Sequence, residues 1–115
     1  MREKAKTINE VASFSTDKKV VYIAGKVTGL QYQFTYDKFM QRQMLLEAAG
    51  YHVINPMELV HQDAEWKQAM RICISFLPHA DYIDLLPCWQ DSEGAKWEAA
   101  IAHRLDIPVL KVTVS

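Results

Sequence analysis

Apolar runs and apolar stripes alternate along most of the chain. Residues 20–24 (VVYIA) form an unbroken run of β-branched, aromatic and small apolar side chains, which is typical of a strand covered on both faces in a parallel sheet. Shorter runs of the same kind predict further strands at about residues 51–54, 81–86 and 107–112. Between the strands, apolar residues recur at helical spacing. The predicted helices cover about residues 34–49, 62–77 and 92–105.

The predicted elements follow the order β-α-β-α-β-α-β. Strands that alternate with helices are joined by right-handed crossovers and form a parallel sheet with helices on both faces. We therefore expect an α/β fold, a three-layer α/β/α sandwich with about four strands in the order 2-1-3-4. Such folds bind ligands beyond the carboxyl ends of the strands, where the strand order reverses. Here that point lies between strands one and three, beside loops 25–30, 55–61 and 87–92.

Composition and charge exclude several classes of protein. The 115 residues are 50% hydrophobic and 23% charged, which excludes a disordered or collagen-like chain. The net charge of −1 disfavours binding to a nucleic-acid polymer and disfavours a polybasic membrane anchor. Residues 1–18 lack the apolar core of a secretory signal, and no run approaches the roughly 20 apolar residues of a membrane span. We therefore expect a cytoplasmic protein, with an N-terminal extension at 1–18 and one domain at 19–115.

Metal and cofactor sites are not expected. The four His residues and the two Cys residues lack the spacing of zinc ligands, and no CxxC pair is present. Cys73 falls on the apolar stripe of the second predicted helix, which is typical of a small buried hydrophobic residue. We therefore expect no metal ligands and two free thiols in a reducing compartment.

An acidic residue interrupts the small-residue stripe of the third predicted helix. Glu98 lies three positions after Ala95 and four before Ala102, so it shares a helix face with both. A carboxylate on such a face is either a functional group with a perturbed pKa or a surface residue on a helix whose buried stripe runs instead through Trp97 and Leu105. Spacing alone leaves both interpretations open.

The loop after the first predicted strand contains two glycines, in the segment GKVTG at residues 25–29. Glycines permit close approach of the backbone to a ligand, and backbone N–H groups can bind an anion. Gly25, Lys26, Thr28 and Gly29 are therefore candidate substrate-binding residues. The segment matches neither GxGxxG nor the Walker A sequence, so an ordinary strand-to-helix turn is an equal alternative.

The start of the third predicted helix is a second candidate binding region. Ser92 or Asp91 is expected to cap this helix, and its free N–H groups together with Ser92 offer a place for a phosphate or carboxylate. Gly94 follows in the first turn. Trp89 is placed to stack on a base or a ring. The alternatives are that Ser92 only caps the helix and that Trp89 only closes the core.

Four segments together resemble the nucleoside 2-deoxyribosyltransferase superfamily. They are residues 22–29 (YIAGKVTG), 55–56 (NP), 80–83 (ADYI) and 86–98 (LPCWQDSEGAKWE). The pattern Trp-x-x-Ser-x-Gly-Ala-x-x-Glu in the last segment is the most specific, and the similarity extends over about residues 19–112. The resemblance is closest to the small nucleoside 2-deoxyribosyltransferase-like proteins of bacteria and phages. It is more distant to the deoxynucleoside 5′-monophosphate N-glycosidases.

The resemblance implies a flavodoxin-like fold and the cleavage or transfer of an N-glycosidic bond in a (deoxy)nucleoside or its 5′-monophosphate. Glu98 corresponds to the nucleophile that attacks the anomeric carbon of the sugar, as in a retaining glycosidase. Tyr22 corresponds to the residue that orients this carboxylate. Loop 25–29 and Asn55 would then lie along the substrate, and Ser92 would contact a phosphate. The implied partner is a nucleoside or nucleotide, with no cofactor, and we expect a homodimer.

One position departs from the superfamily pattern. Active members carry an Asp on the second helix that assists protonation of the leaving base, and this chain has Cys73 there. General acid–base assistance is typically worth about 10²- to 10⁴-fold in rate. Either Asp84 or Asp91 compensates, or the chain cleaves slowly, or it only binds nucleotides. The alternative functions are therefore a catalytically impaired nucleotide-binding or sensing module and a homo-oligomeric structural protein whose interface contains Trp66 and Trp97.

Overall fold

Three parallel strands form the centre of the domain. The computed structural model describes residues 18–111. In it, β1 (Val20–Ala24) lies between β2 (His52–Ile54) and β3 (Tyr82–Leu85), and β1 pairs in parallel with both neighbours. This order, β2-β1-β3, confirms the α/β fold and the predicted arrangement of the first three strands.

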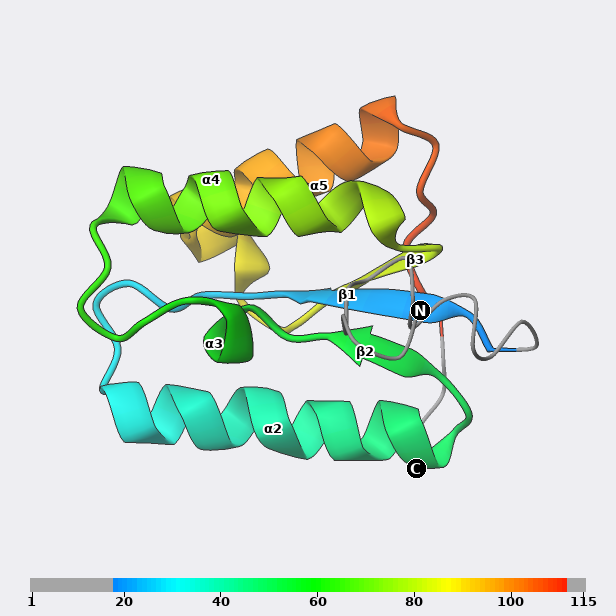
Figure 1. Cartoon of the computed structure of the whole chain (residues 1–115), viewed down its shortest axis with the longest axis horizontal. Coiled ribbons are helices and arrows are strands. Elements are labelled where there is room, and N and C mark those ends of the chain that lie inside the picture. The colour runs from blue at the N-terminus through cyan, green and yellow to red at the C-terminus, as the bar shows by residue number, and fades with distance from the viewer. Residues whose placement is uncertain (1–17, 112–115) are drawn as a thin grey trace, which may run out of the picture.

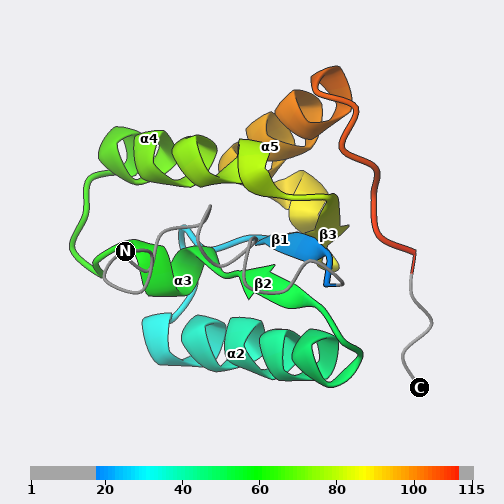
Figure 2. The same ribbon diagram turned by 45° about the vertical axis from the view of Figure 1, so that its right-hand side comes forward.

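Helices cover both faces of this sheet (Figure 1). The helix α2 (Tyr32–Ala48) lies on one face, and α4 (Trp66–Phe76) and α5 (Glu93–Arg104) lie on the other. The short helix α3 (Pro56–Leu59) connects β2 with the segment that leads to α4. The view turned by 45° shows the same stacking of helix, sheet and helix (Figure 2). The elements therefore form three layers, as the alternating pattern predicted.

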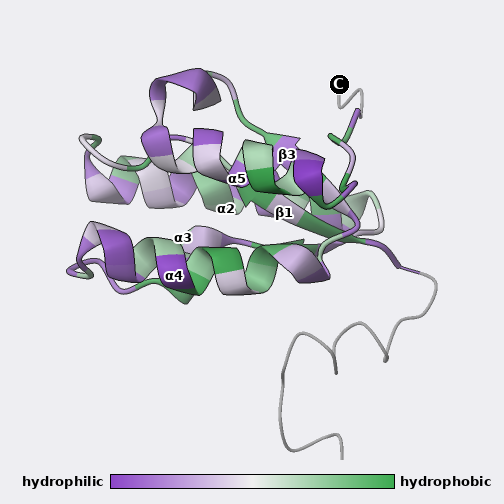
Figure 3. Ribbon diagram, turned by 90° about the horizontal axis from the view of Figure 1, so that it is seen from above, coloured by the Kyte–Doolittle hydropathy of each residue, from purple (hydrophilic) through white to green (hydrophobic). Residues whose placement is uncertain are grey.

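The side chains of β1 alternate between the two helical layers. Val20, Tyr22 and Ala24 pack with residues of α4 and α5, whereas Val21 and Ile23 pack with residues of α2. All five are buried, which explains the unbroken apolar run of this strand. Hydrophobic and hydrophilic residues also alternate along α4 and α5, as expected of helices with one buried face (Figure 3). Tyr22 consequently faces the layer that contains α5.

The segment after β2 differs from the prediction. Asn55 ends the strand as expected, but its side chain also caps α3, since Oδ1 accepts a hydrogen bond of 2.9 Å from the backbone N–H of Met57. A turn follows, closed by a hydrogen bond of 3.0 Å from the N–H of Ala64 to the carbonyl oxygen of His61. Because this turn occupies the residues assigned to the start of the second helix, α4 begins at Trp66.

The predicted fourth strand is represented in the described residues by a single parallel bridge. Val109 pairs with Ile83 of β3, and the N–H of Leu110 donates a hydrogen bond of 2.8 Å to the carbonyl oxygen of Ile83. Pro108 has no N–H to donate, which limits the pairing on its side. Residues 18–111 thus contain three strands where four were expected. Residues 112–115 and residues 1–17, which make up nearly all of the predicted extension, lie outside the described part.

Helix ends follow the predicted signals. Gly50 comes directly after α2 and its cap and has a φ of 102°, a left-handed conformation that favours glycine. Ser92 is the residue that caps α5. Pro78 lies in a short 3-10 turn, Leu77–His79, where α4 ends. Within residues 18–111, none of the helices is both long enough and apolar enough to cross a bilayer.

Candidate active site

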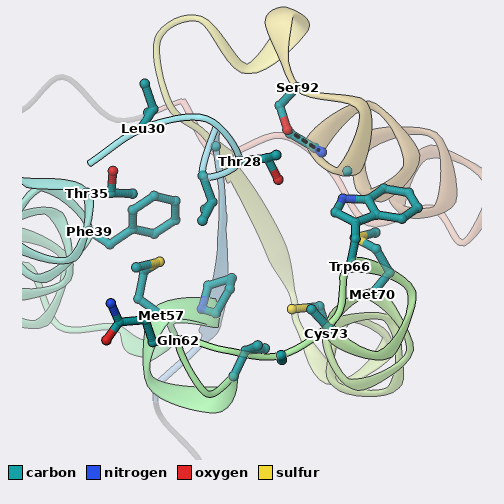
Figure 4. A pocket seen from close by; sticks show the side chains of 18 of the residues that line it. Thr28, Leu30, Thr35, Phe39, Met57, Gln62, Trp66, Met70, Cys73 and Ser92 are labelled. Carbon is teal, nitrogen blue, oxygen red and sulfur yellow. Dashed lines mark hydrogen bonds between the residues drawn. The ribbon is translucent and has the colours of Figure 1, made fainter. Parts of the chain in front are cut away.

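A cavity of about 490 Å³ opens beside the carboxyl end of β1 (Figure 4). Its walls come from the loop after β1, the first half of α2, the segment from α3 to α4, the inner face of α4 and the first two turns of α5. Small-molecule sites typically enclose roughly 300–1,000 Å³. The cavity lies where the predicted topology places a ligand, although loop 87–92 contributes only Ser92 to its wall.

Glu98 and Tyr22 form a buried polar pair at this cavity. The Tyr22 hydroxyl donates a hydrogen bond of 2.6 Å to Oε2 of Glu98. Glu98 lines the cavity although only 5% of its surface is exposed, and Tyr22 is fully buried. On the same helix, Trp97 is 45% exposed, so the stripe that would have placed Glu98 at the surface is not the buried one. The interpretation of Glu98 as a buried carboxylate is therefore confirmed.

Burial controls the protonation of this pair. Desolvation raises the pKa of Glu98 from 4.5 to about 7, and the hydrogen bond from Tyr22 opposes part of this rise. Burial and the neighbouring Glu98 raise the pKa of Tyr22 well above its ordinary value. Glu98 therefore gains and loses its proton near neutral pH while Tyr22 remains a hydrogen-bond donor. Ionisation in this range is common among functional groups that react with a ligand.

Cys73 of α4 lines the same cavity (Figure 4). It lies close enough to Glu98 and Tyr22 for both to affect the pKa of its thiol. The residue is 5% exposed, and burial raises the pKa of its thiol to about 11. The nearby Glu98 carboxylate acts in the same direction, whereas a hydrogen bond with Tyr22 acts against it. The thiol therefore stays protonated at neutral pH and is a weak acid.

The two aspartates considered as replacements for the missing acid lie elsewhere. Asp84 is on the face of β3 that packs against α2, where Arg42 donates hydrogen bonds of 2.6 Å from Nε and 3.0 Å from Nη2 to its carboxylate. Asp91 is exposed and does not line the cavity. The structure therefore gives no support to the alternative in which one of them compensates for Cys73.

The loop after β1 contributes part of the predicted set. Gly25 and Thr28 line the cavity, whereas Lys26 and Gly29 do not. A Cβ atom on Gly25 would lie 3.0 Å from Cδ1 of Leu86, so the absence of a side chain lets the loop pass close to the sheet. Gly29 has a φ of 86°, which marks it as a turn residue. Gly25 and Thr28 thus remain candidates for ligand contact.

The beginning of α5 also lines the cavity. Oγ of Ser92 accepts a hydrogen bond of 3.1 Å from the N–H of Ala95, so the capping role is confirmed, and Ser92 and Gly94 both border the cavity (Figure 4). Trp89 packs half-buried against the core, and neither Trp89 nor Asp91 reaches the cavity. Trp89 therefore closes the core, as the alternative interpretation held.

Replacing Ser92 by Ala is expected to lower the free energy of unfolding by about 1 kcal/mol, because the N–H of Ala95 loses its acceptor. Urea unfolding followed by circular dichroism measures the change. Ser75→Ala is the matched control, since its exposed hydroxyl only donates to the carbonyl of Ile72 within α4. Equal stability of the two variants would show that the cap does not stabilise α5.

Asn55 is buried but lies outside the wall of the cavity. Its Oδ1 caps α3, and its Nδ2 donates a hydrogen bond of 2.9 Å to Oε1 of Gln43. Its polar atoms are thus engaged within the protein. The position of Asn55 therefore gives no support to the substrate-binding role that the resemblance implied.

Several residues of the cavity wall were not predicted from the sequence to be site residues. They come from α2, from α3 and the loop after it, and from the start of α4: Thr35, Phe39, Met57, His61, Gln62, Asp63, Trp66 and Met70. Helical spacing assigns Phe39 and Met70 to buried stripes, but it does not distinguish a stripe that faces the core from one that faces a cavity. The turn at 61–64 was missed because its residues were assigned to a helix.

The polar groups around the cavity suit an organic ligand. The hydroxyl groups of Thr28 and Ser92 and the amide of Gln62 can form hydrogen bonds with sugar hydroxyls and base edges. Trp66, which packs edge-on against Trp97 with ring centroids 5.1 Å apart, adds an aromatic surface. In the part of the chain that the structure describes, no three His, Cys, Asp or Glu side chains gather in a group that would hold a metal ion.

Comparisons with known proteins identify a family but no activity. No curated protein and no solved structure matches the chain. Residues 19–111 match the family model described as a domain of unknown function, DUF4406. This match spans the sheet, the helices and the whole cavity wall. Because it covers most of the 115 residues, the chain belongs to the DUF4406 family.

Proposed function

We propose that this protein cleaves or transfers the N-glycosidic bond of a (deoxy)nucleoside or its 5′-monophosphate, with Glu98 as the nucleophile. The observation that carries the proposal is the 2.6 Å hydrogen bond between Tyr22 and Glu98 at the wall of a ligand-sized cavity. Burying a carboxylate without a cationic partner destabilises a fold, so such a group usually serves the ligand. The resemblance of residues 22–29 and 86–98 to the nucleoside 2-deoxyribosyltransferases supports the same role.

The proposed reaction has two displacement steps. In the first, a carboxylate oxygen of Glu98 attacks C1′ of the sugar, the C1′–N bond breaks, and its electron pair leaves with the base. In the second, water or another base attacks C1′ and releases the carboxylate. The developing positive charge on the sugar lies beside an anion in a desolvated site, where electrostatic stabilisation is strongest.

Replacing Tyr22 by Phe is expected to reduce kcat/KM about 10- to 100-fold, because a hydrogen bond to a charged group contributes about 1.5–3 kcal/mol. Loss of this donor also raises the pKa of Glu98, since the hydrogen bond lowers it in the native protein. The acidic limb of the pH–rate profile should therefore move to higher pH. Tyr82→Phe, on the α2 face of the sheet, is the control. A lower rate with an unmoved limb would contradict the orienting role.

The experiment that tests the proposal is a search for free base. The protein is incubated with each of the four deoxynucleosides and their 5′-monophosphates, and released base is separated by chromatography. We expect base release from at least one of these compounds, and none from the Glu98→Gln variant. Equal base release by the two proteins, or none from either, would reject the proposal.

A second candidate function is nucleotide binding without catalysis. It is favoured by Cys73, which occupies the position of the superfamily acid and whose pKa of about 11 makes it a poor proton donor. If Cys73→Asp creates no activity and nucleotides still raise the melting temperature, binding is the better description. A ligand at 100 times its Kd should stabilise the fold by about 2.7 kcal/mol. No shift with any nucleotide would reject both functions.

We also infer that Val109, which pairs with Ile83 of β3, marks the edge strand of a four-stranded, flavodoxin-like sheet.

We further infer that the chain forms a homodimer. Trp97 is exposed beside a shallow groove between α4 and α5 lined by Met70 and Ile74. Aromatic residues in such positions are typical of interface centres. Sedimentation equilibrium is expected to give a dimer that Trp97→Glu dissociates, and a monomeric native protein would reject this inference.

A further inference from the structure

The charge on the cavity wall distinguishes between the two substrate classes that the proposed function leaves open. We propose that the substrate is a neutral (deoxy)nucleoside with a free 5′-hydroxyl group, and that the site disfavours the 5′-monophosphate. This inference rests on the proposed nucleophilic role of Glu98 and narrows the substrate class of the same site.

The wall of the cavity is acidic. Within residues 18–111, the carboxylates of Asp63 and Glu98 line the cavity, and no Lys or Arg side chain lines it. Glu98 accepts its hydrogen bond from the neutral Tyr22 hydroxyl rather than from a cation. His61 also lines the wall, but its Nδ1 accepts a hydrogen bond of 3.1 Å from the N–H of Asp63, as the unprotonated nitrogen of a neutral ring does. A phosphate in this cavity is therefore repelled by the wall.

The basic side chains nearest in sequence to the wall do not offset this charge. Lys26 belongs to the loop after β1 but does not line the cavity. Lys96 of α5 pairs with Glu93 at 3.6 Å on the surface. Lys67 of α4 lines the shallow groove between α4 and α5 instead. The side chains that the structure describes thus leave a phosphate in the cavity without a cationic partner.

The amino end of α5 is already complemented by groups of the protein. Oγ of Ser92 accepts a hydrogen bond of 3.1 Å from the N–H of Ala95, and the acidic side chain of Glu93 lies in the first turn. Because negative charge in the first turn interacts with the helix dipole, this helix end attracts a further anion less strongly. The Ser92 hydroxyl can still donate its own hydrogen to a neutral 5′-hydroxyl group.

The covalent structure of a nucleotide places its phosphate close to the nucleophile. C1′ must contact Glu98 in the first step, and the 5′-phosphate is joined to the same sugar ring through C4′ and C5′. In any orientation of the sugar, the phosphate therefore lies within roughly 8 Å of the carboxylate, which is one Debye length at physiological ionic strength. Two anions at this separation repel each other in a desolvated site. Burial already raises the pKa of Glu98 to about 7, and a phosphate beside it would further disfavour the ionised form that attacks C1′.

The test compares a deoxynucleoside with its own 5′-monophosphate, so that the base and the bond that breaks are the same. We expect kcat/KM for base release to be at least about tenfold higher for the nucleoside at low ionic strength. This ratio should fall in about 1 M NaCl, where the Debye length is about 3 Å and salt screens the repulsion. An equal or higher kcat/KM on the monophosphate, or a ratio that does not change with salt, would overturn the proposal.

A substitution tests the same charge from the side of the protein. Thr28 lies at the exposed edge of the cavity (Figure 4), and Thr28→Arg adds a cation there that can pair with a phosphate. The ratio of kcat/KM for the nucleoside to kcat/KM for the monophosphate should fall at least about tenfold from its native value. Gln41→Arg adds the same charge at an exposed position of α2 outside the cavity wall and should leave the ratio unchanged.

The outcomes separate this proposal from the function on which it rests. A ratio that falls equally in both Arg variants, or in neither, would overturn the charge discrimination. If Thr28→Arg does not fold, the salt series on the native protein decides the same question. Glu98-dependent base release that favours the monophosphate would overturn the nucleoside preference alone. No base release from either compound would overturn the proposed function, and this inference with it.

Discussion

Glu98→Gln is expected to reduce base release by at least about 10³-fold in kcat/KM, because the amide cannot form the glycosyl ester of the first step. The substitution keeps the size of the side chain, and its carbonyl oxygen can still accept the hydrogen bond from Tyr22. The loss therefore reports on chemistry rather than on packing. Initial rates of base release, measured on the preferred substrate at pH 7, give the ratio.

Glu93→Gln is the matched control for this prediction. Glu93 lies in the first turn of the same helix, is exposed, and pairs with Lys96 at 3.6 Å. Surface pairs of this kind contribute little to stability. The control is expected to stay within about twofold of the native rate. A Glu98→Gln variant that keeps a tenth or more of native activity would contradict the nucleophilic role.

The second large effect is a pH-dependent difference in stability. Ionised Glu98 destabilises the folded protein, because burial raises its pKa from 4.5 to about 7. In the folded state the carboxyl holds its proton to higher pH than in the unfolded chain. Stability is therefore lost as the pH rises from about 4.5 to about 7, and the loss is complete above that range. The side chain of the Glu98→Gln variant cannot ionise, so the variant does not lose this part of its free energy of unfolding.

The free energy of unfolding of Glu98→Gln relative to the native protein should consequently rise by about 2 kcal/mol between pH 5.5 and pH 8.5. Tyr22 and Cys73, which face Glu98 from β1 and α4, stay neutral in this range because their pKa values are raised. Ionisable groups that the two proteins share cancel in the difference. Urea unfolding at both pH values measures it. A difference that does not change with pH would mean that Glu98 is solvated rather than buried.

Much of the fold was predictable, because a strand that is buried on both faces has an unbroken run of apolar residues in the sequence. The run VVYIA is typical of a strand covered from both sides, and β1 has the predicted bounds. The helix that contains Glu98 was predictable because Ser92 supplies an N-cap signal before a run of small residues. The limited pairing of the fourth strand was not predictable. An apolar segment that contains Pro108 has the same sequence pattern whether it pairs over its whole length or at a single bridge.

The candidate site was predictable in its chemistry but not in its shape. Glu98 could be identified as a candidate because a carboxylate on a helix face of alanines has few structural roles. Its partner Tyr22 was identified only through the resemblance of its segment to a known superfamily. The wall formed by α2 and the turn at 61–64 depends on how distant segments pack together, and periodicity within one element does not report that packing. Asn55 shows the opposite case, because a motif residue turned out to cap a helix.

The most direct test of the account is to trap the glycosyl ester. A 2′-fluorinated deoxynucleoside slows both displacement steps by destabilising positive charge on the sugar, and the second step then limits turnover. Mass spectrometry of the intact protein should show one added fluorinated sugar, peptide mapping should place it on Glu98, and Glu98→Gln should remain unlabelled. An adduct on another residue, or base release from the natural substrate with no adduct at any time, would contradict nucleophilic attack by Glu98.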